Sequence, residues 1–175
     1  MTTATVDLPV TIAALPPVAR FNLRVRSADL AAASKAFGVP LPQRIGQGVH
    51  ADGRSAWALG PDEWLLHAPE VDSSGIDADF ASIRAEAPHS LVDVSDREIA
   101  LAVEGARAEE LLTAGCPIDL RRLAPGDAKR TIFDNAQIVL LRDAPDRFRI
   151  EVWRSFASDV EDLLHTVNAE LASGF

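Results

Sequence analysis

Apolar and polar residues alternate along two short stretches of the chain, and a helix-like run follows each of them. Residues 20–26 carry an apolar side chain at every second position, a period typical of a strand with one buried face. The stretch that begins at Ile99 has the same period. Each helix-prone run then ends at a glycine, Gly38 or Gly115, and a segment containing proline comes next. The same order of strand and helix therefore occurs twice.

Two further features recur downstream in the same order. The turn and the aromatic residue of 60–64 match those of 144–148. Later, three apolar residues in each half have the spacing of one helix face: Ile76, Phe80 and Ile83, then Val160, Leu164 and Val167. Because these features recur in one order, the sequence predicts an internal duplication. A single duplicated pair is not a solenoid, which usually needs about three stacked repeats or more.

Local signals place the ends of individual elements. Ser27 has the hydroxyl of a helix N-cap, and Gly38 can end that helix in the left-handed conformation. Asp52-Gly53 predicts a tight hairpin, because such a turn needs positive φ. Ser158 and Glu161 have the spacing of a capping box at the start of the last helix. Helices are expected over 73–86, roughly 106–114 and from 158 onward, and later strands near 130–141 and 147–153.

The predicted fold class is α+β, with internally duplicated strand-helix-strands-helix units and mostly antiparallel sheets whose helices lie on one face. Residues 18–90 form a first α+β lobe and residues 91–175 a second, the two sharing one core. The second lobe is expected to open with residues 91–94. Residues 1–17 lack sustained periodicity and are predicted to be an N-terminal tail, which is often disordered or laid along a partner.

Composition narrows the class of protein. A hydrophobic content of 47% is globular, and the net charge of −9 argues against nucleic acid, whose phosphates require clustered Lys and Arg. No apolar run approaches the roughly 18 residues that would span a bilayer, so no membrane contact is expected. No basic region characteristic of a signal peptide precedes the first apolar stretch, and the lone Cys116 cannot form an internal disulfide. These features predict a cytoplasmic protein.

No set of residues forms a recognisable active site. The four histidines, His50, His67, His89 and His165, lack the spacing of metal ligands. Gly46-Gln47-Gly48 lacks the third glycine and the following helix of a dinucleotide fingerprint. Residues 93–96 are read as a turn between strands, although their two carboxylates could serve acid–base chemistry. Cys116 is read as a small buried residue, with a nucleophilic thiolate as the alternative.

Two groups of residues are candidates for a partner interface. Arg121, Arg122, Lys129 and Arg130 bracket a Pro-Gly turn and form the densest basic cluster, either a solvated loop or a dock for an acidic partner. Trp57, Trp64 and Trp153 lie on predicted strands. Core packing is the default for each tryptophan, although Trp and Arg are enriched where interfaces concentrate their binding energy.

Several sequence blocks, in this order and spacing, resemble the gamma subunit family of heterotetrameric sarcosine oxidase. The resemblance covers about residues 18–172, and its blocks are 59–66, 92–97, 115–120, Gly126, 129–132 and 154–157. It implies a fold similar to the folate-binding domain of glycine-cleavage aminomethyltransferases, which is itself duplicated. It also implies a complex that oxidises sarcosine to glycine, yielding hydrogen peroxide and formaldehyde or methylenetetrahydrofolate.

The resemblance also sets expectations for sites and partners. Alpha, beta and delta subunits would be the partners and would hold the FAD, covalent FMN, NAD, folate and zinc, whereas this chain would be a structural component without catalytic, cofactor or metal residues. The folate-dependent relatives carry a K-G-C-Y-x-G-Q type signature, but here Gly115-Cys116 lies between Ala114 and Pro117. The expected interface residues are Trp57, Trp64, Arg121, Arg122, Arg130, Arg154 and Phe156. Alternatives are a free-standing folate-binding protein of one-carbon metabolism and a Cys116-dependent hydrolase.

Overall fold

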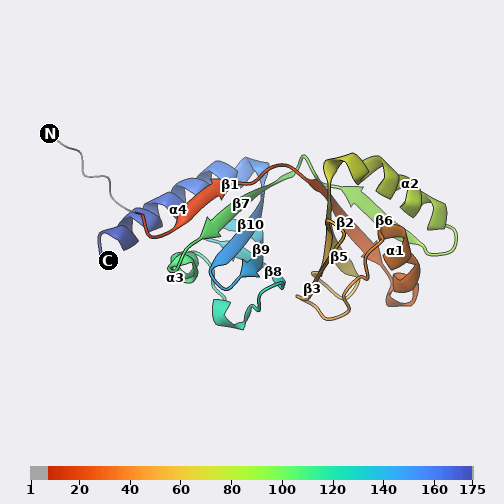
Figure 1. Ribbon diagram of the computed structural model, residues 1–175, viewed down its shortest axis with the longest axis horizontal. Coiled ribbons are helices and arrows are strands. Elements are labelled where there is room, and N and C mark those ends of the chain that lie inside the picture. The colour runs from red at the N-terminus through yellow and green to blue at the C-terminus, as the bar shows by residue number, and fades with distance from the viewer. Residues whose placement is uncertain (1–7, 175) are drawn as a thin grey trace. The chain divides into compact units, whose positions relative to one another are not determined.

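In the computed structural model, which describes residues 8–174, the elements form two units, each with one sheet and helices packed against it (Figure 1). The N-terminal unit consists of residues 16–98 and 126–129. The C-terminal unit consists of residues 8–15, 99–125 and 130–174. This architecture confirms the predicted α+β class.

The N-terminal unit has a five-stranded sheet of order β3-β4-β5-β2-β6. Its central strand β2 pairs antiparallel with β5 on one side and with β6 on the other. The elements are β2 (Ala19–Val25), η1 (Ser27–Asp29), α1 (Leu30–Phe37), β3 (Gly48–Ala51), β4 (Arg54–Ala58), β5 (Glu63–Ala68), η2 (Glu70–Asp72), α2 (Ser73–Ile83) and β6 (His89–Asp93).

The C-terminal unit has a five-stranded sheet of order β1-β7-β10-β9-β8. β9 and β10 form an antiparallel hairpin, and β1 pairs antiparallel with β7. The elements are β1 (Thr11–Ala14), β7 (Glu98–Glu104), α3 (Ala108–Thr113), η3 (Leu120–Arg122), β8 (Ala128–Phe133), β9 (Ala136–Ala144), β10 (Arg147–Trp153), η4 (Arg154–Phe156) and α4 (Ala157–Ala172).

The two units have equivalent topologies. Reading the second sheet from its other edge gives β8-β9-β10-β7-β1, which matches β3-β4-β5-β2-β6 strand for strand. Helices α1 and α3 follow the equivalent strands β2 and β7, and α2 and α4 follow β5 and β10. From β5 through α2, every element is matched 84 positions later: η2 by η4 and the start of α2 by the start of α4. The structure therefore confirms the internal duplication.

Each unit packs its own apolar cluster between sheet and helices, and the expectation that the two lobes share one core stays a prediction. Alternate residues of β2, Phe21 and Leu23, are fully buried with Ile76 and Phe80 of α2. In the other unit, alternate residues of β7, β9 and β10 are buried with α3 and α4, among them Leu101, Val103, Leu112, Leu140, Phe148, Ile150 and Leu164. The physical reason is that each sheet has its own helix-covered face.

The boundary expected between the lobes also differs from the structure. Leu91 and Val92 were expected to open the second lobe, but they lie in β6 and pair with Leu23 and Asn22 of β2. Strand β6 therefore completes the first sheet. After α2 the chain returns to β2 and pairs with it, because the edge of β2 that β5 does not cover offers unpaired backbone groups.

The expectation of a tail over residues 1–17 is wrong for residues 11–14, and residues 1–7 lie outside the described part. Residues 11–14 form β1 on the edge of β7, in the place that β6 occupies beside β2. Its sequence, Thr-Ile-Ala-Ala, has little apolar periodicity because the strand is mostly exposed. Backbone pairing with β7 and a hydrogen bond from Asn168 Nδ2 to the carbonyl oxygen of Val10 (2.6 Å) hold the segment in place.

The sequence predicted the turns correctly, but its two predicted serine helix caps are wrong. Asp52 and Gly53 both have positive φ, as the hairpin requires, and Gly38 ends α1 in the left-handed conformation. Neither Ser27 nor Ser158 caps a helix, because a short 3-10 turn precedes both α1 and α4 and moves their starts. The strand expected near 130–141 is two strands, β8 and β9, joined by a turn at Asp134, which has φ of 52°.

Candidate partner-binding surface

Cys116 lies in the apolar cluster of the C-terminal unit and is 5% exposed. Burial raises the pKa of its thiol to about 12, because the interior disfavours the thiolate. A nucleophilic cysteine instead needs a lowered pKa and access to substrate. The structure therefore supports the reading of Cys116 as a packing residue and leaves the hydrolase alternative without a reactive thiol.

The residues at 93–96 make a turn. The backbone N–H of Ser95 donates to Asp93 Oδ1 (2.8 Å), and Ser95 Oγ accepts from the backbone N–H of Arg20 (2.9 Å). The hydroxyl is thus used to join the turn to β2. Among residues 8–174, no group of three or more His, Cys, Asp or Glu side chains could hold a metal ion.

The glycines of Gly46-Gln47-Gly48 serve backbone packing at the start of β3. Gly46 N–H donates to the Ala58 carbonyl oxygen (2.7 Å), and Gly46 in turn accepts from Ala128 N–H (2.7 Å). A Cβ on Gly48 would meet the backbone of Gly126 and the ring of Trp57. The segment leads into a strand, so it lacks the helix N-terminus of a phosphate site.

A groove of about 330 Å³ runs between α1 and α2. Its walls combine small residues with charged ones, and its lining residues are Ala32, Lys35, Ala36, Asp79, Ser82, Ile83 and Glu86. The groove is therefore mixed in character, unlike the apolar pocket with a few convergent polar groups that is typical of a ligand site.

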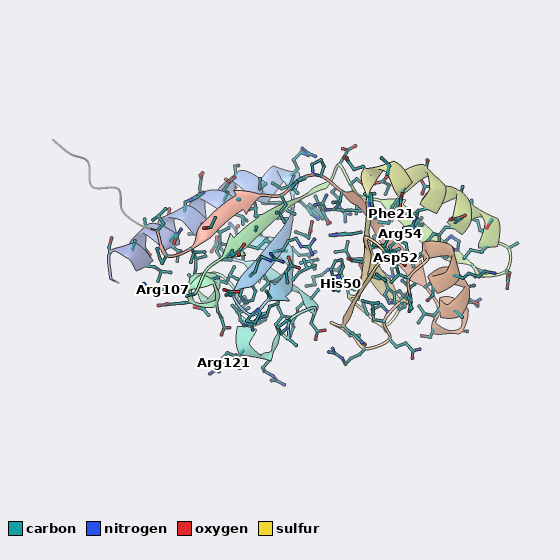
Figure 2. All side chains as sticks on the ribbon, viewed as in Figure 1. Phe21, His50, Asp52, Arg54, Arg107 and Arg121 are labelled. Carbon is teal, nitrogen blue, oxygen red and sulfur yellow. The ribbon has the colours of Figure 1, made fainter. Side chains whose placement is uncertain are left out.

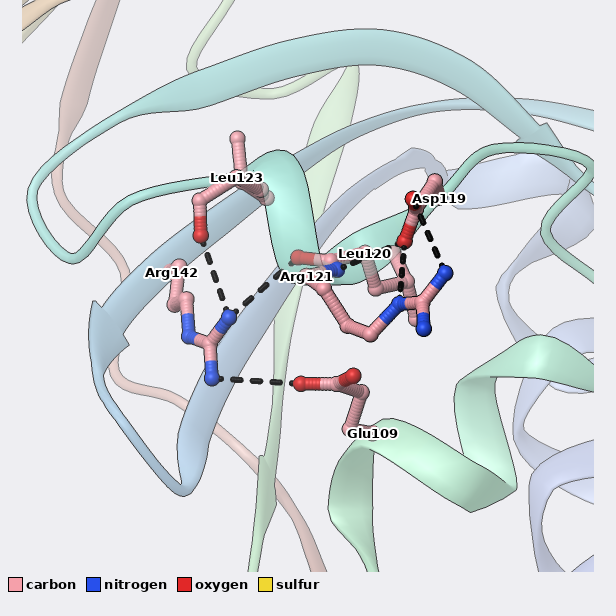
Figure 3. A network of polar contacts seen from close by, with 6 residues as sticks. All are labelled: Glu109, Asp119, Leu120, Arg121, Leu123 and Arg142. Atoms are coloured by element: carbon pink, nitrogen blue, oxygen red, sulfur yellow. Dashed lines mark hydrogen bonds and ion pairs between the residues drawn. The ribbon is translucent and has the colours of Figure 1, made fainter.

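Arg142 fixes the loop that contains the first two residues of the predicted basic cluster (Figure 3). Its Nη1 donates to the carbonyl oxygens of Leu120 (3.2 Å) and Leu123 (3.1 Å), and its Nη2 donates to Glu109 Oε2 (3.2 Å). The guanidinium also lies 4.9 Å from the ring centre of Phe148. With 12% of the side chain exposed, Arg142 acts as an internal support for the loop rather than as a surface contact.

Arg121 points outward from η3, with 80% of its side chain exposed (Figure 2). Its Nε donates to Asp119 Oδ1 (2.8 Å) and its Nη2 to Asp119 Oδ2 (3.1 Å). The hydrogen bonds from Arg121 lower the pKa of Asp119, so the pair carries no net charge at neutral pH. Arg122 is exposed on the same turn, whereas Lys129 and Arg130 lie on β8. The basic cluster is thus divided, and its most exposed arginine is already paired.

The expectation that Trp57 and Trp64 lie at a partner interface is wrong. Trp57 is 1% exposed, and its Nε1 donates to the Gly126 carbonyl oxygen (3.1 Å). Trp64 is 2% exposed and donates to the Pro42 carbonyl oxygen (2.8 Å). Both indoles thus have their polar edge satisfied and their rings buried, so the core interpretation holds for them.

A different group of large apolar side chains is exposed on the C-terminal unit. Trp153 ends β10 with 43% of its surface exposed, Phe156 lies in η4 with 40% exposed, and Ile132 on β8 is 41% exposed. Sequence reasoning named Phe156 and its neighbour Arg154, weighed Trp153 as core, and missed Ile132. We call Ile132, Trp153 and Phe156 the Trp153 surface.

Comparison with solved structures agrees with this architecture. The chain superposes on an aminomethyltransferase T of the glycine cleavage system from Bartonella henselae with a TM-score of 0.69, covering 91% of this chain and 46% of that one at 13% identity. That likeness establishes the fold class alone. A chain of the heterotetrameric sarcosine oxidase from Corynebacterium sp. U-96 matches with a TM-score of 0.85 at 28% identity, covering 93% of this chain and 85% of that chain.

Sequence comparisons specify the family. Residues 24–170 match the model of the family "Sarcosine oxidase, gamma subunit family". Sarcosine oxidase subunit gamma of Arthrobacter sp. is 34% identical over 66% of this chain and 58% of its own length. Sarcosine oxidase subunit gamma of Corynebacterium sp. strain P-1 is 30% identical over 84% of this chain and 73% of its own length.

These findings define a duplicated α+β chain related to a multisubunit oxidase. The chain belongs to the sarcosine oxidase gamma subunit family. It aligns with less than two thirds of the length of the Arthrobacter relative. No helix among residues 8–174 is both long and apolar enough to cross a bilayer.

Proposed function

We propose that this chain is the gamma subunit of a heterotetrameric sarcosine oxidase and that it contributes surface and shape to the assembly rather than chemistry. The observation that carries this proposal is the match to a heterotetrameric sarcosine oxidase over 93% of this chain and 85% of the other. A likeness over nearly both whole chains supports an equivalent place in an equivalent assembly.

The division of labour follows from what the oxidation requires. Conversion of sarcosine to glycine removes two electrons from the N-methyl carbon, and these reduce oxygen to hydrogen peroxide, while the carbon leaves as formaldehyde or as methylenetetrahydrofolate. We assign the flavins FAD and FMN, together with NAD, folate and zinc, to the alpha, beta and delta subunits of a cytoplasmic complex. The buried, protonated thiol of Cys116 supports a non-catalytic role for this chain.

A free-standing folate-binding protein has less support. The folate-dependent signature is absent around Gly115-Cys116. In the groove between α1 and α2, the carboxylates of Asp79 and Glu86 outnumber the single cation of Lys35. Folates carry their own carboxylates, so this groove would repel the glutamate tail of the ligand.

Co-expression tests the proposal. The chain is tagged and produced with the alpha, beta and delta subunits of its own organism, and the captured material is assayed for flavin absorbance and for hydrogen peroxide formed from sarcosine. We expect capture of a yellow, sarcosine-oxidising complex, and no turnover by the purified chain alone. A tagged chain that remains alone, while the other three subunits assemble and turn over normally without it, would contradict the proposal.

A further inference from the structure

One edge of the N-terminal sheet has unpaired backbone groups. Strand β6 lies at the end of the sheet and, among residues 8–174, pairs only with β2 (Figure 1). The backbone N–H of Val94 donates to the Arg20 carbonyl oxygen (2.8 Å), and hydrogen-bonded pairs alternate along an antiparallel ladder. Ser90 and Val92 therefore also turn their N–H and C=O groups toward β2. The backbone groups that point out of the sheet, which we call the β6 edge, are those of His89, Leu91 and Asp93.

The other sheet edges of the described chain carry features that discourage pairing with a further strand. Strands β1 and β3 have four residues each, prolines follow β1 at 16–17, and the Gly126 carbonyl oxygen lies beside Gly48 at the start of β3. Residues 129–130 of β8 are Lys and Arg. Natural sheets protect their edges in these ways. Strand β6 has five residues without lysine or proline, and its Val92 is 49% exposed, so the β6 edge is open to a further strand.

One flank of α2 lies over the β6 edge and carries two charged residues. Ser73 Oγ donates to Asp93 Oδ2 (3.4 Å), which places the Ser73 side of the helix above β6. Asp77 and Arg84 follow Ser73 by four and eleven positions, so they share this flank. Both are exposed, and within residues 8–174 neither side chain makes an ion pair or a hydrogen bond. Their charges are therefore available to a partner at the β6 edge.

An extended segment is the kind of partner that these groups fit. A strand supplies donors and acceptors at the spacing of the β6 edge, and addition of a strand to an open sheet is a general mode of recognition. The side chains of an added strand would alternate between the α2 side and the opposite side. Asp77 and Arg84 are about 10 Å apart along the helix, so a cation and an anion two or four positions apart would face them.

A second copy of this chain fits the β6 edge less well. Phe80 contacts His89 at one end of β6, with ring centres 5.2 Å apart, and Ser73 contacts the other end. Asp77, about halfway between Ser73 and Phe80, is therefore level with Leu91 in the middle of β6. Two β6 strands paired antiparallel about Leu91 would bring the two Asp77 carboxylates toward each other. Repulsion between these like charges opposes self-pairing.

We propose that the β6 edge receives an extended segment of a neighbouring oxidase subunit as a sixth strand, with a cation of that segment facing Asp77 and an anion facing Arg84. This inference rests on the proposed function, since it names the edge through which a gamma subunit would join its complex. Backbone hydrogen bonds to the β6 edge supply affinity, and the two charges fix the register of the added strand.

Hydrogen exchange of the unaltered chain tests the added strand directly. In the free chain the Leu91 amide should exchange quickly, whereas the amides of Ser90 and Val92, which face β2, should exchange slowly. In the complex captured with the alpha, beta and delta subunits, we expect exchange at Leu91 to slow by about tenfold or more, while both neighbours remain slow. Equally fast exchange of Leu91 in both states would overturn the inference. Protection in the free chain that rises with its own concentration would also overturn it, in favour of a second copy.

Charge reversal on α2 tests the assigned charges. Asp77→Lys sets a cation against the cation of the added strand, and we expect it to reduce recovery of the co-expressed oxidase subunits about tenfold. The matched control is Asp79→Lys, the same change on the opposite flank of α2, which lines the groove beside α1. It should change recovery less than about threefold, and circular dichroism of both variants should be that of the unaltered chain. Equal recovery of the two variants would overturn the inference. If the unaltered chain captures no oxidase subunits, the proposed function itself fails instead.

Discussion

At the scale of single side chains, the guanidinium of Arg142 is the clearest example of a group that supports a loop from inside the protein. It reaches carbonyl oxygens at both ends of the η3 turn and a carboxylate of α3. This role could not be predicted from sequence, because three of the acceptors are backbone carbonyls that only the fold brings near: those of Leu120, Leu123 and Pro145. The exposed Arg121 therefore depends on a buried arginine about twenty positions away.

Replacing Arg142 tests that dependence. We expect Arg142→Ala to lower the free energy of unfolding by about 2–3 kcal/mol, since it leaves several carbonyl oxygens without a donor. Arg142→Lys should recover only part of the loss, because an ammonium lacks the planar fork that contacts several acceptors at once. Urea denaturation measures both. Arg122→Ala, at an exposed position of the same loop, serves as the control and should change stability by less than about 0.5 kcal/mol.

The buried thiol of Cys116 predicts a specific pH dependence. Its pKa is raised from 9.0 to about 12 in the folded protein, so the folded state holds the proton more tightly than the unfolded chain does. This contribution to stability is complete below about pH 9 and is lost as the pH rises toward 12. At pH 8 the native protein should not react with a thiol reagent within minutes, and full reaction should follow addition of denaturant. Rapid labelling of native protein would show that the thiol is accessible.

Among the elements, those with strong periodicity were predicted from sequence and those defined by pairing were not. Strand β2, the hairpin at Asp52 and the last helix were recognised because their apolar residues repeat with a regular period or their turn needs positive φ. Strand β1 was missed because it is held by backbone hydrogen bonds to β7 and is mostly exposed. A strand of that kind leaves little trace in side-chain pattern.

The attachment of β1 can be measured through Asn168, a 1% exposed residue of α4. Asn168→Ala removes the donor to the Val10 carbonyl oxygen, and burial of that unpaired oxygen costs about 1–3 kcal/mol. We expect β1 to open locally, which should accelerate hydrogen exchange of the Leu15 amide, a donor to Ala100. Thr166→Ala, on the exposed side of α4, should leave exchange of Leu15 unchanged.

Two glycines, one just after a helix and one within a helix, offer a second test at this scale, which concerns the packing around the helices. A Cβ at Gly115, after α3, would lie 2.7 Å from Cδ2 of Phe133, so Gly115→Ala should destabilise the protein by about 1–3 kcal/mol. At Gly75, within α2, a Cβ would meet nothing within 4 Å. Gly75→Ala should therefore stabilise the protein by up to about 1 kcal/mol, because alanine favours the helix. Thermal unfolding of the two variants should shift in opposite directions, and destabilisation by Gly75→Ala would contradict this packing.

For the whole molecule, duplication is the feature that the sequence revealed best. The repeated order of strand, helix, turn and helix predicted two equivalent units, and the two sheets match strand for strand. Pattern alone could not show that the units have separate apolar clusters, because a buried position looks the same in either arrangement.

The candidate interface was less predictable than the fold. Trp57 and Trp64 share their residue type with Trp153, and only the structure separates the buried pair from the exposed one. The useful sequence signal was the offset of 84 positions between the two units. It aligns Trp153 with Pro69 and Phe156 with Asp72. A difference between duplicated units marks positions that the fold does not dictate.

The most direct test of the account is the composition of the particle that contains this chain in its native source. The chain is tagged at its chromosomal locus, captured under mild conditions and analysed by native mass spectrometry. The account predicts a flavin-containing assembly with one copy of each of four different subunits, which oxidises sarcosine. Recovery of the chain as a lone monomer, with the sarcosine-oxidising activity in a separate particle that lacks it, would contradict the account.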